Sequence, residues 1–323
     1  MNLVKRLRSS SGDGRAFHIY PPGVPPVIRN HSVGSKLLNR WNPSATMSED
    51  KNKLRKLFGV NPMHMVGEGA RSKCWAVNDP KTHEIKLLKH VEVEGEKDHR
   101  WVEQLESEHL IASKFNHPNI RASYGLKYKP SKRKAKDVGL IMQFVDGIDL
   151  VEWQQTSKPS LDRLLEVFIS CADALNHMHV VGYAHADMKP INVLIDSRSR
   201  QPLIIDLGQA CSLNTKKERV QGTPGFIAPE QVKRQSITYL TDVYNWGATM
   251  YFMLAGRKID TENFTAPPVP TGCPSELSDL VLECVQPVPM SRPDSMRYLR
   301  DSLIRIRSNQ ARSSASTETG TSA

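Results

Sequence analysis

The sequence contains few cysteines, and they follow no pairing pattern. There are five in 323 residues, an odd number, and no two of them form a C-x-x-C pair. A chain of this length buries a sizeable core without a disulfide framework, which would use an even set of cysteines. We therefore expect free thiols in a reducing compartment. The cysteines are Cys74, Cys171, Cys211, Cys273 and Cys284.

Long hydrophobic runs are also missing. Residues 246–255, W-G-A-T-M-Y-F-M-L-A, are apolar but shorter than the roughly 18–20 residues that a membrane span requires. The N-terminus, M-N-L-V-K-R-L-R-S-S-S, is basic and has no apolar core behind it, which argues against a secretory signal. Its Arg and Ser content leaves an organelle transit peptide open. The prediction is a soluble, cytoplasmic protein without a transmembrane segment.

Acidic residues are scarce in the N-terminal part of the chain. Residues 1–58 contain eleven Lys and Arg and three Asp and Glu, which accounts for +8 of the net charge of +10. The remainder is close to neutral, which argues against a domain built around a nucleic-acid surface. We interpret 1–58 as a basic, mostly disordered arm with a possible acidic or anionic partner. Residues 308–323 are low in complexity and are also predicted to be disordered.

A second basic segment, K-Y-K-P-S-K-R-K-A-K, runs from Lys127 to Lys136. It falls in a loop between predicted strands. The segment is compatible with binding to nucleic acid, anionic lipid or an acidic partner. It is also compatible with a nuclear localisation signal and with a plain solvated loop.

The pattern of apolar residues changes once along the chain. Residues 60 to about 150 resemble short strands with turns, interrupted by one helical segment from Val102 to Phe115. After Leu150 the apolar spacing is helical, as in the stripe over 161–175 that follows Ser160, a candidate N-cap. The sequence therefore predicts a small strand-rich lobe followed by a larger helical lobe.

The first candidate for phosphate chemistry is G-E-G-A-R-S-K-C, from Gly67 to Cys74. Glycines allow a tight turn whose backbone N–H groups approach phosphate oxygens, although a structural turn has the same composition. No G-K-[ST] follows, so it is not a Walker loop. Lys89 ends the apolar pattern K-L-L-K and would reach such phosphates; Lys86 is its rival. Glu108, on the predicted helix, would fix a lysine ammonium, or be a solvated helix charge.

A second group of polar residues lies in H-A-D-M-K-P-I-N-V-L-I-D, from His185 to Asp196. Asp187 is a candidate proton acceptor, Lys189 would steady a phosphoryl group, and Asn192 offers an amide oxygen to a metal. Fourteen residues after Asn192, the apolar strand P-L-I-I leads into Asp206 of D-L-G. A carboxylate in that position suits Mg²⁺, which prefers one or two carboxylates plus phosphate oxygens.

Further motifs follow in order: G-T-P-G-F-I-A-P-E at 222–230, D-V-Y-N-W-G at 242–247 and S-R-P at 291–293. Together with the preceding segments they resemble the signature set of eukaryotic-type (Hanks-type) serine/threonine protein kinases over about residues 60–306. The resemblance implies an α+β, bilobal fold. It places the kinase domain at 59–307. The small lobe, an antiparallel sheet and one helix, would span about 59–145, and the mainly helical lobe about 146–307.

The resemblance also implies ATP and Mg²⁺ as cofactors and a nucleotide site between the lobes. Lys89 would contact phosphates and pair with Glu108, and Met142 would guard the adenine pocket. Backbone groups of 143–145 would bind adenine, and Asp149 would reach the ribose. The residues assigned to the nucleotide are Gly67, Gly69, Lys89, Met142, Gln143, Val145 and Asp149.

For the reaction itself, the resemblance assigns Asp187 as catalytic base, supported by Lys189, and Asn192 and Asp206 as Mg²⁺ ligands. Lys189 and the G-T-P segment with Thr223 are similar to serine/threonine rather than tyrosine kinases, so Ser and Thr hydroxyls of protein substrates are the expected acceptors. The scaffold would include a buried Glu230–Arg292 ion pair, with His185 and Asp242 holding the catalytic loop.

The sequence departs from the family pattern at several positions. Ser72 stands at the third loop glycine, Leu207 at the aromatic of D-F-G, and Phe226 at a common Tyr. Leu87 occupies the place of a small alanine above adenine, where its bulk would weaken nucleotide binding unless the smaller Cys74 compensates.

Ala186 is the departure with the clearest consequence, because the family has an arginine there that binds a phosphate on the activation segment. The resemblance is therefore to the non-RD subtype, and we expect activity without strong dependence on phosphorylation of Ser212 or Thr215. A pseudokinase scaffold is the alternative, but it predicts loss of catalytic residues that are all present. A small-molecule phosphotransferase is a second alternative, against which A-P-E and Arg292 argue.

Overall fold

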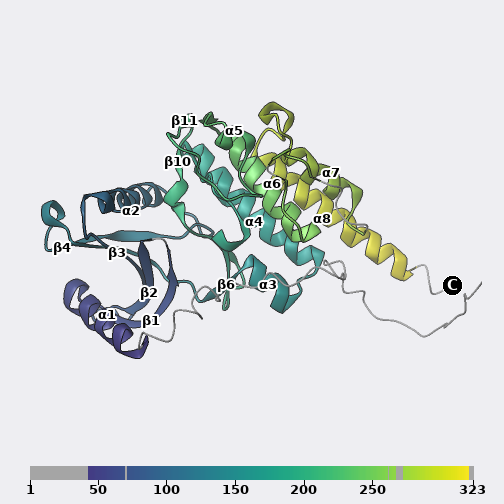
Figure 1. The fold of residues 1–323 in the computed structure, drawn as a ribbon. Coiled ribbons are helices and arrows are strands. Elements are labelled where there is room, and N and C mark those ends of the chain that lie inside the picture. The colour runs from purple at the N-terminus through teal and green to yellow at the C-terminus, as the bar shows by residue number, and fades with distance from the viewer. Residues whose placement is uncertain (1–42, 70, 261, 267–271, 320–323) are drawn as a thin grey trace, which may run out of the picture.

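The computed structural model describes residues 43–69, 71–260, 262–266 and 272–319. Residues 1–42 and 320–323, which belong to the predicted disordered arm and tail, lie outside the described residues. The chain forms a sheet-rich lobe followed by a larger helical lobe (Figure 1), as the change in apolar spacing predicted. Within the described ranges, no helix is both long and apolar enough to cross a membrane.

The first lobe is built on an antiparallel sheet with the strand order β1-β2-β3-β5-β4. Side chains alternate between its two faces. In β3, Leu87 and Val91 join one buried cluster and Leu88 joins another. Because both faces are covered, nearly all of β5 is buried. The strands are β1 (Asn61–Glu68), β2 (Ser72–Asn78), β3 (Ile85–Glu92), β4 (Ser123–Lys129) and β5 (Asp137–Gln143).

One face of this sheet is covered by the helix α2 (His99–Ala112), which was predicted over 102–115. Val102 and Leu105 pack against Leu87, Leu140 and other sheet residues. The helix ends three residues earlier than predicted, because the backbone turns after Ala112 with hydrogen bonds from Lys114 and Phe115 to carbonyls three residues back.

The other face is covered by α1 (Pro43–Phe58), which corrects the prediction of disorder for residues 43–58. Leu54 and Phe58 are buried against Trp75 and Leu88, and Leu57 packs beside them. The spacing of these three α1 residues, i, i+3 and i+4, is that of an amphipathic helix on a core. Figure 1 shows α1 and α2 on opposite faces of the sheet. The folded domain therefore begins before residue 59.

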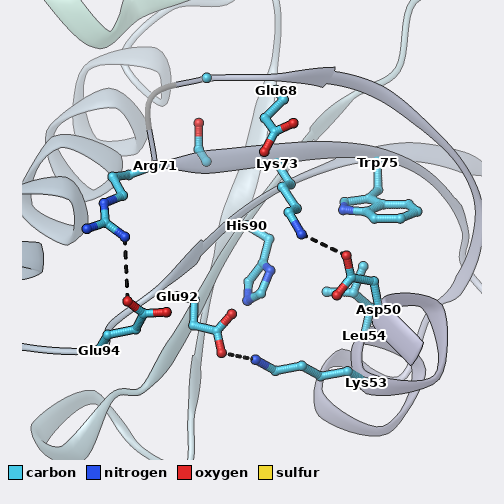
Figure 2. Close-up of a pocket in the computed structure, with 12 residues that line it drawn as sticks. Asp50, Lys53, Leu54, Glu68, Arg71, Lys73, Trp75, His90, Glu92 and Glu94 are labelled. Carbon is cyan, nitrogen blue, oxygen red and sulfur yellow. Dashed lines mark hydrogen bonds and ion pairs between the residues drawn. The ribbon is translucent and has the colours of Figure 1, made fainter. Parts of the chain in front are cut away.

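Charged side chains surround this packed face (Figure 2). Lys73 of β2 lies 2.7 Å from Asp50 of α1, and Arg71 lies 3.6 Å from Glu94. Lys53 contacts Glu92 and also lies 3.0 Å from Asp137. Apart from Asp137, these residues border a cavity of about 270 Å³ together with Gly69. Helix α1 is thus linked to the strand that follows the phosphate-loop candidate.

The second lobe is mainly helical. The hydroxyl of Ser160 accepts a hydrogen bond from the Arg163 amide at 3.2 Å, which confirms the predicted N-cap of α4. Nearly all of α6 is buried, and a Cβ on Gly247 would lie 2.3 Å from the Cβ of Cys284, so α6 and α7 touch where only glycine fits. The helices are α3 (Leu150–Ser157), α4 (Leu161–Val180), α5 (Pro229–Val232), α6 (Tyr239–Ala255), α7 (Ser275–Cys284) and α8 (Met296–Thr319).

Helix α8 corrects the second prediction of disorder, because it continues through most of 308–323. Its apolar stripe of Met296, Leu299, Leu303 and Ile306 belongs to the core of the helical lobe. Beyond this stripe the sequence offers Gln, Ala and Arg, which are good helix formers. The packed part therefore nucleates a helix that extends past its last core residue.

Short strands between the helices position the loops at the boundary of the two lobes. Strands β8 and β9 pair antiparallel, with Val193 opposite Ile204. This register brings Asn192, which precedes β8, beside the segment that leads from β9 to Asp206; the Ile205 amide donates to the Asn192 carbonyl at 2.8 Å. These strands are β6 (Gly147–Asp149), β7 (Tyr183–Ala184), β8 (Val193–Asp196), β9 (Pro202–Ile204), β10 (Cys211–Ser212), β11 (Thr215–Lys216) and β12 (Ser236–Ile237).

Candidate active site

The lysine and glutamate singled out in the sheet lobe form a buried ion pair. The Nζ of Lys89 on β3 lies 2.7 Å from the Oε2 of Glu108 on α2, whereas the rival Lys86 binds Asp79 at 3.2 Å. Burial alone would lower the pKa of Lys89, but the charges of Glu108 and Asp206 outweigh it and raise the pKa. Lys89 is therefore fully protonated at neutral pH and is held by Glu108.

Asp206 comes from the other lobe and completes this group. Its Oδ1 lies 3.6 Å from the Nζ of Lys89, and its side chain is 44% exposed. The residue has a left-handed backbone with φ of 63°, which few non-glycine residues adopt, so its carboxylate is directed by a strained turn. Burial opposes ionisation, but Lys89 outweighs it and lowers the pKa of Asp206. The carboxylate is ionised and partly open to solvent.

A second cluster forms around Asp187 in the catalytic-loop candidate. Lys189 Nζ donates to the Oδ2 of Asp187 at 2.7 Å and to the hydroxyl of Thr223 at 2.9 Å. The Nδ2 of Asn192 donates to the carbonyl of Asp187 at 2.8 Å. Asp187 is 7% exposed, so its carboxylate has a fixed place in the protein. The residues predicted from one sequence segment thus meet, together with Thr223 from 34 residues further along the chain.

The backbone of this loop is anchored by a carboxylate from α6. The buried Asp242 accepts hydrogen bonds from the amides of His185 at 2.8 Å and Ala186 at 2.7 Å, and it lies 2.8 Å from Nε2 of His179. Burial would raise the pKa of Asp242, but His179 and these amides lower it overall. The His185 ring accepts from the Asp187 amide at 3.2 Å.

The predicted ion pair of the helical lobe is present and bidentate. Arg292 donates from its two Nη atoms to the carboxylate oxygens of Glu230 at 2.7 and 2.9 Å. It also donates to the carbonyl of Leu240 at 2.8 Å. Both residues are buried, at 4% and 6% exposure. Additional hydrogen bonds of this kind are what allow two charges to be buried together.

The residues assigned to a nucleotide come from β1 and the turn after it, from β3 and β5, and from the connection to the second lobe that ends in β6. Gly69 closes a tight turn by donating to the Ser72 carbonyl at 2.7 Å. Met142 is buried opposite Leu87 in the β3–β5 ladder, and Gln143 exchanges hydrogen bonds with Ala122. The carboxylate of Asp149 caps α3 through the Glu152 amide at 3.0 Å, so its contact with a ribose stays a prediction.

Comparison with known protein families decides the identity of this arrangement. Residues 60–304 match the family model described as a protein kinase domain. The chain belongs to the protein kinase family. The five-stranded sheet lobe and the helical lobe accordingly form the bilobal kinase fold.

Curated relatives of this kinase come from bacteria and animals. Serine/threonine-protein kinase PknB of Mycolicibacterium smegmatis is 26% identical over 268 residues, which cover 76% of this chain and 43% of that protein. Serine/threonine-protein kinase nekl-2 of Caenorhabditis elegans is 27% identical, covering 75% of this chain and 73% of that protein. The chain thus spans less than half of the length of PknB and about three quarters of nekl-2.

An apolar cluster surrounds Ala186, where this kinase lacks the family arginine. Ala184, Ala186 and Ile237 are buried together, and Cys211 and Leu213 pack against them. Ala186 has φ of 59°, so its backbone is in the left-handed region. Nearby, the Lys217 ammonium donates a hydrogen bond to the carbonyl of Gln209. An apolar cluster and an internal lysine contact therefore hold the activation segment of this kinase.

Sequence reasoning missed three side chains of this region. Gln231 donates to the Ala186 carbonyl at 2.8 Å and to Gln221 at 3.3 Å, and Lys217 makes the contact just described. Arg121 follows H-P-N-I directly and has a buried Nε without a hydrogen-bond partner in the described part of the chain. Its only sequence signal was a cation directly after H-P-N-I, and position in the sequence does not link such a residue to the active site.

Proposed function

We propose that this chain transfers the γ-phosphoryl group of Mg-ATP to Ser and Thr hydroxyls of protein substrates. The observation that carries this proposal is the contact of Lys189 with both Asp187 and Thr223, at 2.7 and 2.9 Å. A base, a cation and a hydroxyl from the G-T-P segment therefore meet at one point. The Lys89–Glu108 pair and Asp206 would act on the nucleotide that reacts at this point.

Asp206 and Asn192 would hold Mg²⁺. Asp206 is ionised and partly exposed, and Asn192 uses its amide nitrogen toward Asp187, which leaves its amide oxygen for a metal. Within the described ranges, no group of three His, Cys, Asp or Glu residues gathers as a self-contained metal site. Two protein ligands plus phosphate oxygens are the usual arrangement for Mg²⁺. The bound ion would neutralise charge on the phosphates during transfer.

The nucleotide would lie between the lobes. Gly67 and Gly69 would cover its phosphates, because glycine lets the backbone approach phosphate oxygens closely. Lys89, kept in place by Glu108, would contact the phosphates. Met142 and the backbone of 143–145 would bind the base, and Asp149 would reach the ribose.

In the transfer step, Asp187 would accept the proton of the attacking hydroxyl on a carboxylate oxygen. As the new oxygen–phosphorus bond forms, the bond between the γ-phosphorus and the bridging oxygen breaks, and ADP leaves. Lys189 would bind the transferring phosphoryl oxygens. Its contact with Thr223 would keep it beside the attacking hydroxyl. The protein thus acts by positioning and electrostatics rather than by covalent chemistry.

The test is transfer of labelled γ-phosphate from Mg-ATP to the protein and to a generic basic protein acceptor, with Asp206→Ala as control. Label on Ser or Thr that is absent in the control supports the proposal. Absence of label together with absence of Mg-ATP binding would replace it with a non-catalytic scaffold.

We further propose that activity does not depend strongly on phosphorylation of the activation segment. Support comes from the apolar cluster at Ala186 and from Lys217, which contacts Gln209 without any phosphate. Ser212 is exposed and Thr215 lies in β11. The double variant S212A/T215A, and protein treated with a phosphatase, should retain the activity of the untreated protein; a large loss in either would contradict this.

The basic regions are proposed to bind an acidic or anionic partner. The segment 127–136 was predicted to be a loop, but its residues 127–129 lie in β4. Residues 130–136 connect β4 to β5, and Lys132 and Arg133 there are exposed. Lys127 is engaged by the Phe58 carbonyl at 2.9 Å, so it is less available to a partner than its neighbours. We also propose a cytoplasmic location, in accord with the free state of all five cysteines.

A further inference from the structure

The first residues of β2 connect the phosphate-loop candidate to the sheet. The Gly69 amide donates to the carbonyl of Ser72 at 2.7 Å, and Lys73 comes next in the chain. In the ladder of β1 and β2, Lys73 stands opposite Glu68. The position of Ser72 and Lys73 therefore determines where the turn at Gly69 lies.

Alternation along β2 gives its side chains two different environments. Cys74 stands opposite Lys89 in the ladder of β2 and β3, and it packs against the cluster that α2 covers. Trp75 packs with Leu54 of α1 in the cluster on the other face. Lys73 shares its face with Trp75, so its side chain lies on the α1 side of the sheet (Figure 2).

Asp50 of α1 holds the side chain of Lys73. Its Oδ2 lies 2.7 Å from the Nζ of Lys73, and the two side chains are 36% and 43% exposed (Figure 2). Arg71, in the same segment, lies 3.6 Å from Glu94 and 3.8 Å from Asp98, which is longer than a hydrogen bond. Among the described residues, the Asp50 contact is thus the closest ion pair that joins residues 69–73 to another element.

A phosphate-binding loop loses conformational freedom when a nucleotide binds. Glycines give the backbone many accessible conformations, and selecting one of them costs free energy. A contact that holds the end of the loop before the nucleotide arrives lowers this cost, so the nucleotide binds more tightly. Asp50 belongs to α1, across the sheet from the Lys89–Glu108 pair, and would therefore act on the nucleotide only through Lys73.

We propose that Asp50 is a positioning residue for nucleotide binding. By holding Lys73, it keeps the start of β2 and the turn at Gly69 in place for the phosphates of Mg-ATP. The proposal rests on the proposed nucleotide site. It gives a role in that site to α1, which ends at Phe58, before the residues 60–304 that match the kinase family model.

The experiment measures, on the full chain, the Kd of Mg-ADP by titration calorimetry and the KM for ATP and kcat with a generic basic protein as acceptor. D50N should raise both Kd and KM by about threefold to fivefold. Fivefold corresponds to about 1 kcal/mol, the upper end for an exposed ion pair. The value of kcat should not change, because Asp50 does not contact the reacting groups. D50E, which keeps the carboxylate, should retain the wild-type affinity.

The direction of the change separates the contact from long-range electrostatics. Removing the negative charge of Asp50 should by itself favour an anionic nucleotide, whereas loss of the contact weakens its binding. The matched control is K53M. Lys53 also joins α1 to the sheet, but through Glu92 at the end of β3 and Asp137 at the start of β5. K53M removes a positive charge from α1 and should nevertheless leave the Kd of Mg-ADP unchanged.

A double-mutant cycle tests whether Asp50 acts through Lys73. K73M should weaken Mg-ADP at least as much as D50N does. Adding D50N to K73M should cause no further loss, because the contact is already absent. Thermal unfolding of each variant without nucleotide measures stability separately, and D50N and K53M should both show only small shifts.

Three results would overturn the proposal. Unchanged or tighter binding of Mg-ADP by D50N would show that the contact with Lys73 does not position the loop. Equal weakening by D50N and K53M would mean that α1 acts only through the stability of the lobe. In both cases the wild-type protein would still bind nucleotide, and the proposed function would stand. Failure of the wild-type protein to bind Mg-ADP would refute the nucleotide site itself, and this role of Asp50 with it.

Discussion

The ammonium group of Lys217 donates a hydrogen bond to the backbone carbonyl of Gln209, three residues after Asp206. One residue of the activation segment therefore ties that segment to the D-L-G motif at its start. In kinases with an arginine at the place of Ala186, that arginine and a phosphate provide this link. Here the contact is internal to the chain and needs no modification.

Replacing Lys217 with Met should lower phosphoryl-transfer activity by about tenfold, since hydrogen bonds from charged groups contribute about 1.5–3 kcal/mol and tenfold corresponds to about 1.4 kcal/mol. The measurement is kcat on a protein substrate at saturating ATP. Lys216→Met is the control, because its exposed side chain is the immediate neighbour and has no such contact. Equal activity of the two variants would show that the Lys217 contact is not needed.

Asp187→Asn should reduce kcat by about 100-fold or more, the usual contribution of a general base. The affinity for Mg-ADP should change little, because Asp187 contacts Lys189 and Thr223 on the substrate side rather than the Lys89 pair. Steady-state kinetics and titration calorimetry check the two parts. A variant that keeps most of its kcat would remove Asp187 from the role of base.

Glu230→Ala should destabilise the fold by about 3–5 kcal/mol, because it leaves the buried Arg292 charge without its partner. Glu276→Ala is the matched control: Glu276 is 46% exposed and pairs with Arg305 at 3.0 Å, so it should cost no more than about 1 kcal/mol. Urea unfolding of both variants measures the difference. Similar losses in the two variants would mean that burial does not set the strength of the Glu230 pair.

The stabilising contribution of Asp242 should depend on pH. Its pKa in the folded protein is below the ordinary value of 3.8. Such a carboxylate stabilises the fold fully above its unfolded-state pKa, and the contribution is lost as pH falls through the folded-state pKa. Asp242→Asn should therefore be less stable than wild type at neutral pH, with a difference that narrows below about pH 4.

Urea midpoints of wild type and Asp242→Asn across that pH range test this prediction. A difference that stays constant from neutral to acidic pH would show that the Asp242 charge contributes nothing and that only its shape matters.

Leu54→Ala should destabilise the protein by about 2–5 kcal/mol, the cost of a cavity in a packed core. Leu54 is 1% exposed between α1 and the sheet, whereas Met47 on the same helix is 38% exposed and serves as the control when changed to Ala. Thermal or urea unfolding measures both. Equal stability of the two variants would mean that α1 is not part of the cooperative fold.

The sequence was sufficient for the fold and for much of the site because each kinase motif is local. The residues within one motif lie close together in the sequence. Gly67 and Gly69 are two residues apart, and Asp187, Lys189 and Asn192 lie within six residues. The backbone that a strand or loop imposes on them follows from the same residues, so order and spacing were enough to predict the lobes. The Lys89–Glu108 pair joins two elements 19 residues apart, and only the family resemblance predicted it.

Other features depend on contacts between distant parts of the chain. Residues 43–58 belong to a basic, polar region, and their short apolar stripe becomes a helix only because Trp75 and Leu88 offer it a surface. The same holds for α8, whose polar end continues from a packed start. Composition averages over a segment and hides three apolar residues at helical spacing.

The sequence by itself determined the family and the two lobes, since these reside in local motifs. Only the tertiary structure decided what replaces the missing arginine at Ala186, where Arg121 lies, and which partner each buried charge has. The physical reason is that a charge or an apolar side chain is stabilised by its neighbours in space. Folding provides such neighbours for Lys217 and Leu54, whereas the Nε of Arg121 has none among the described residues.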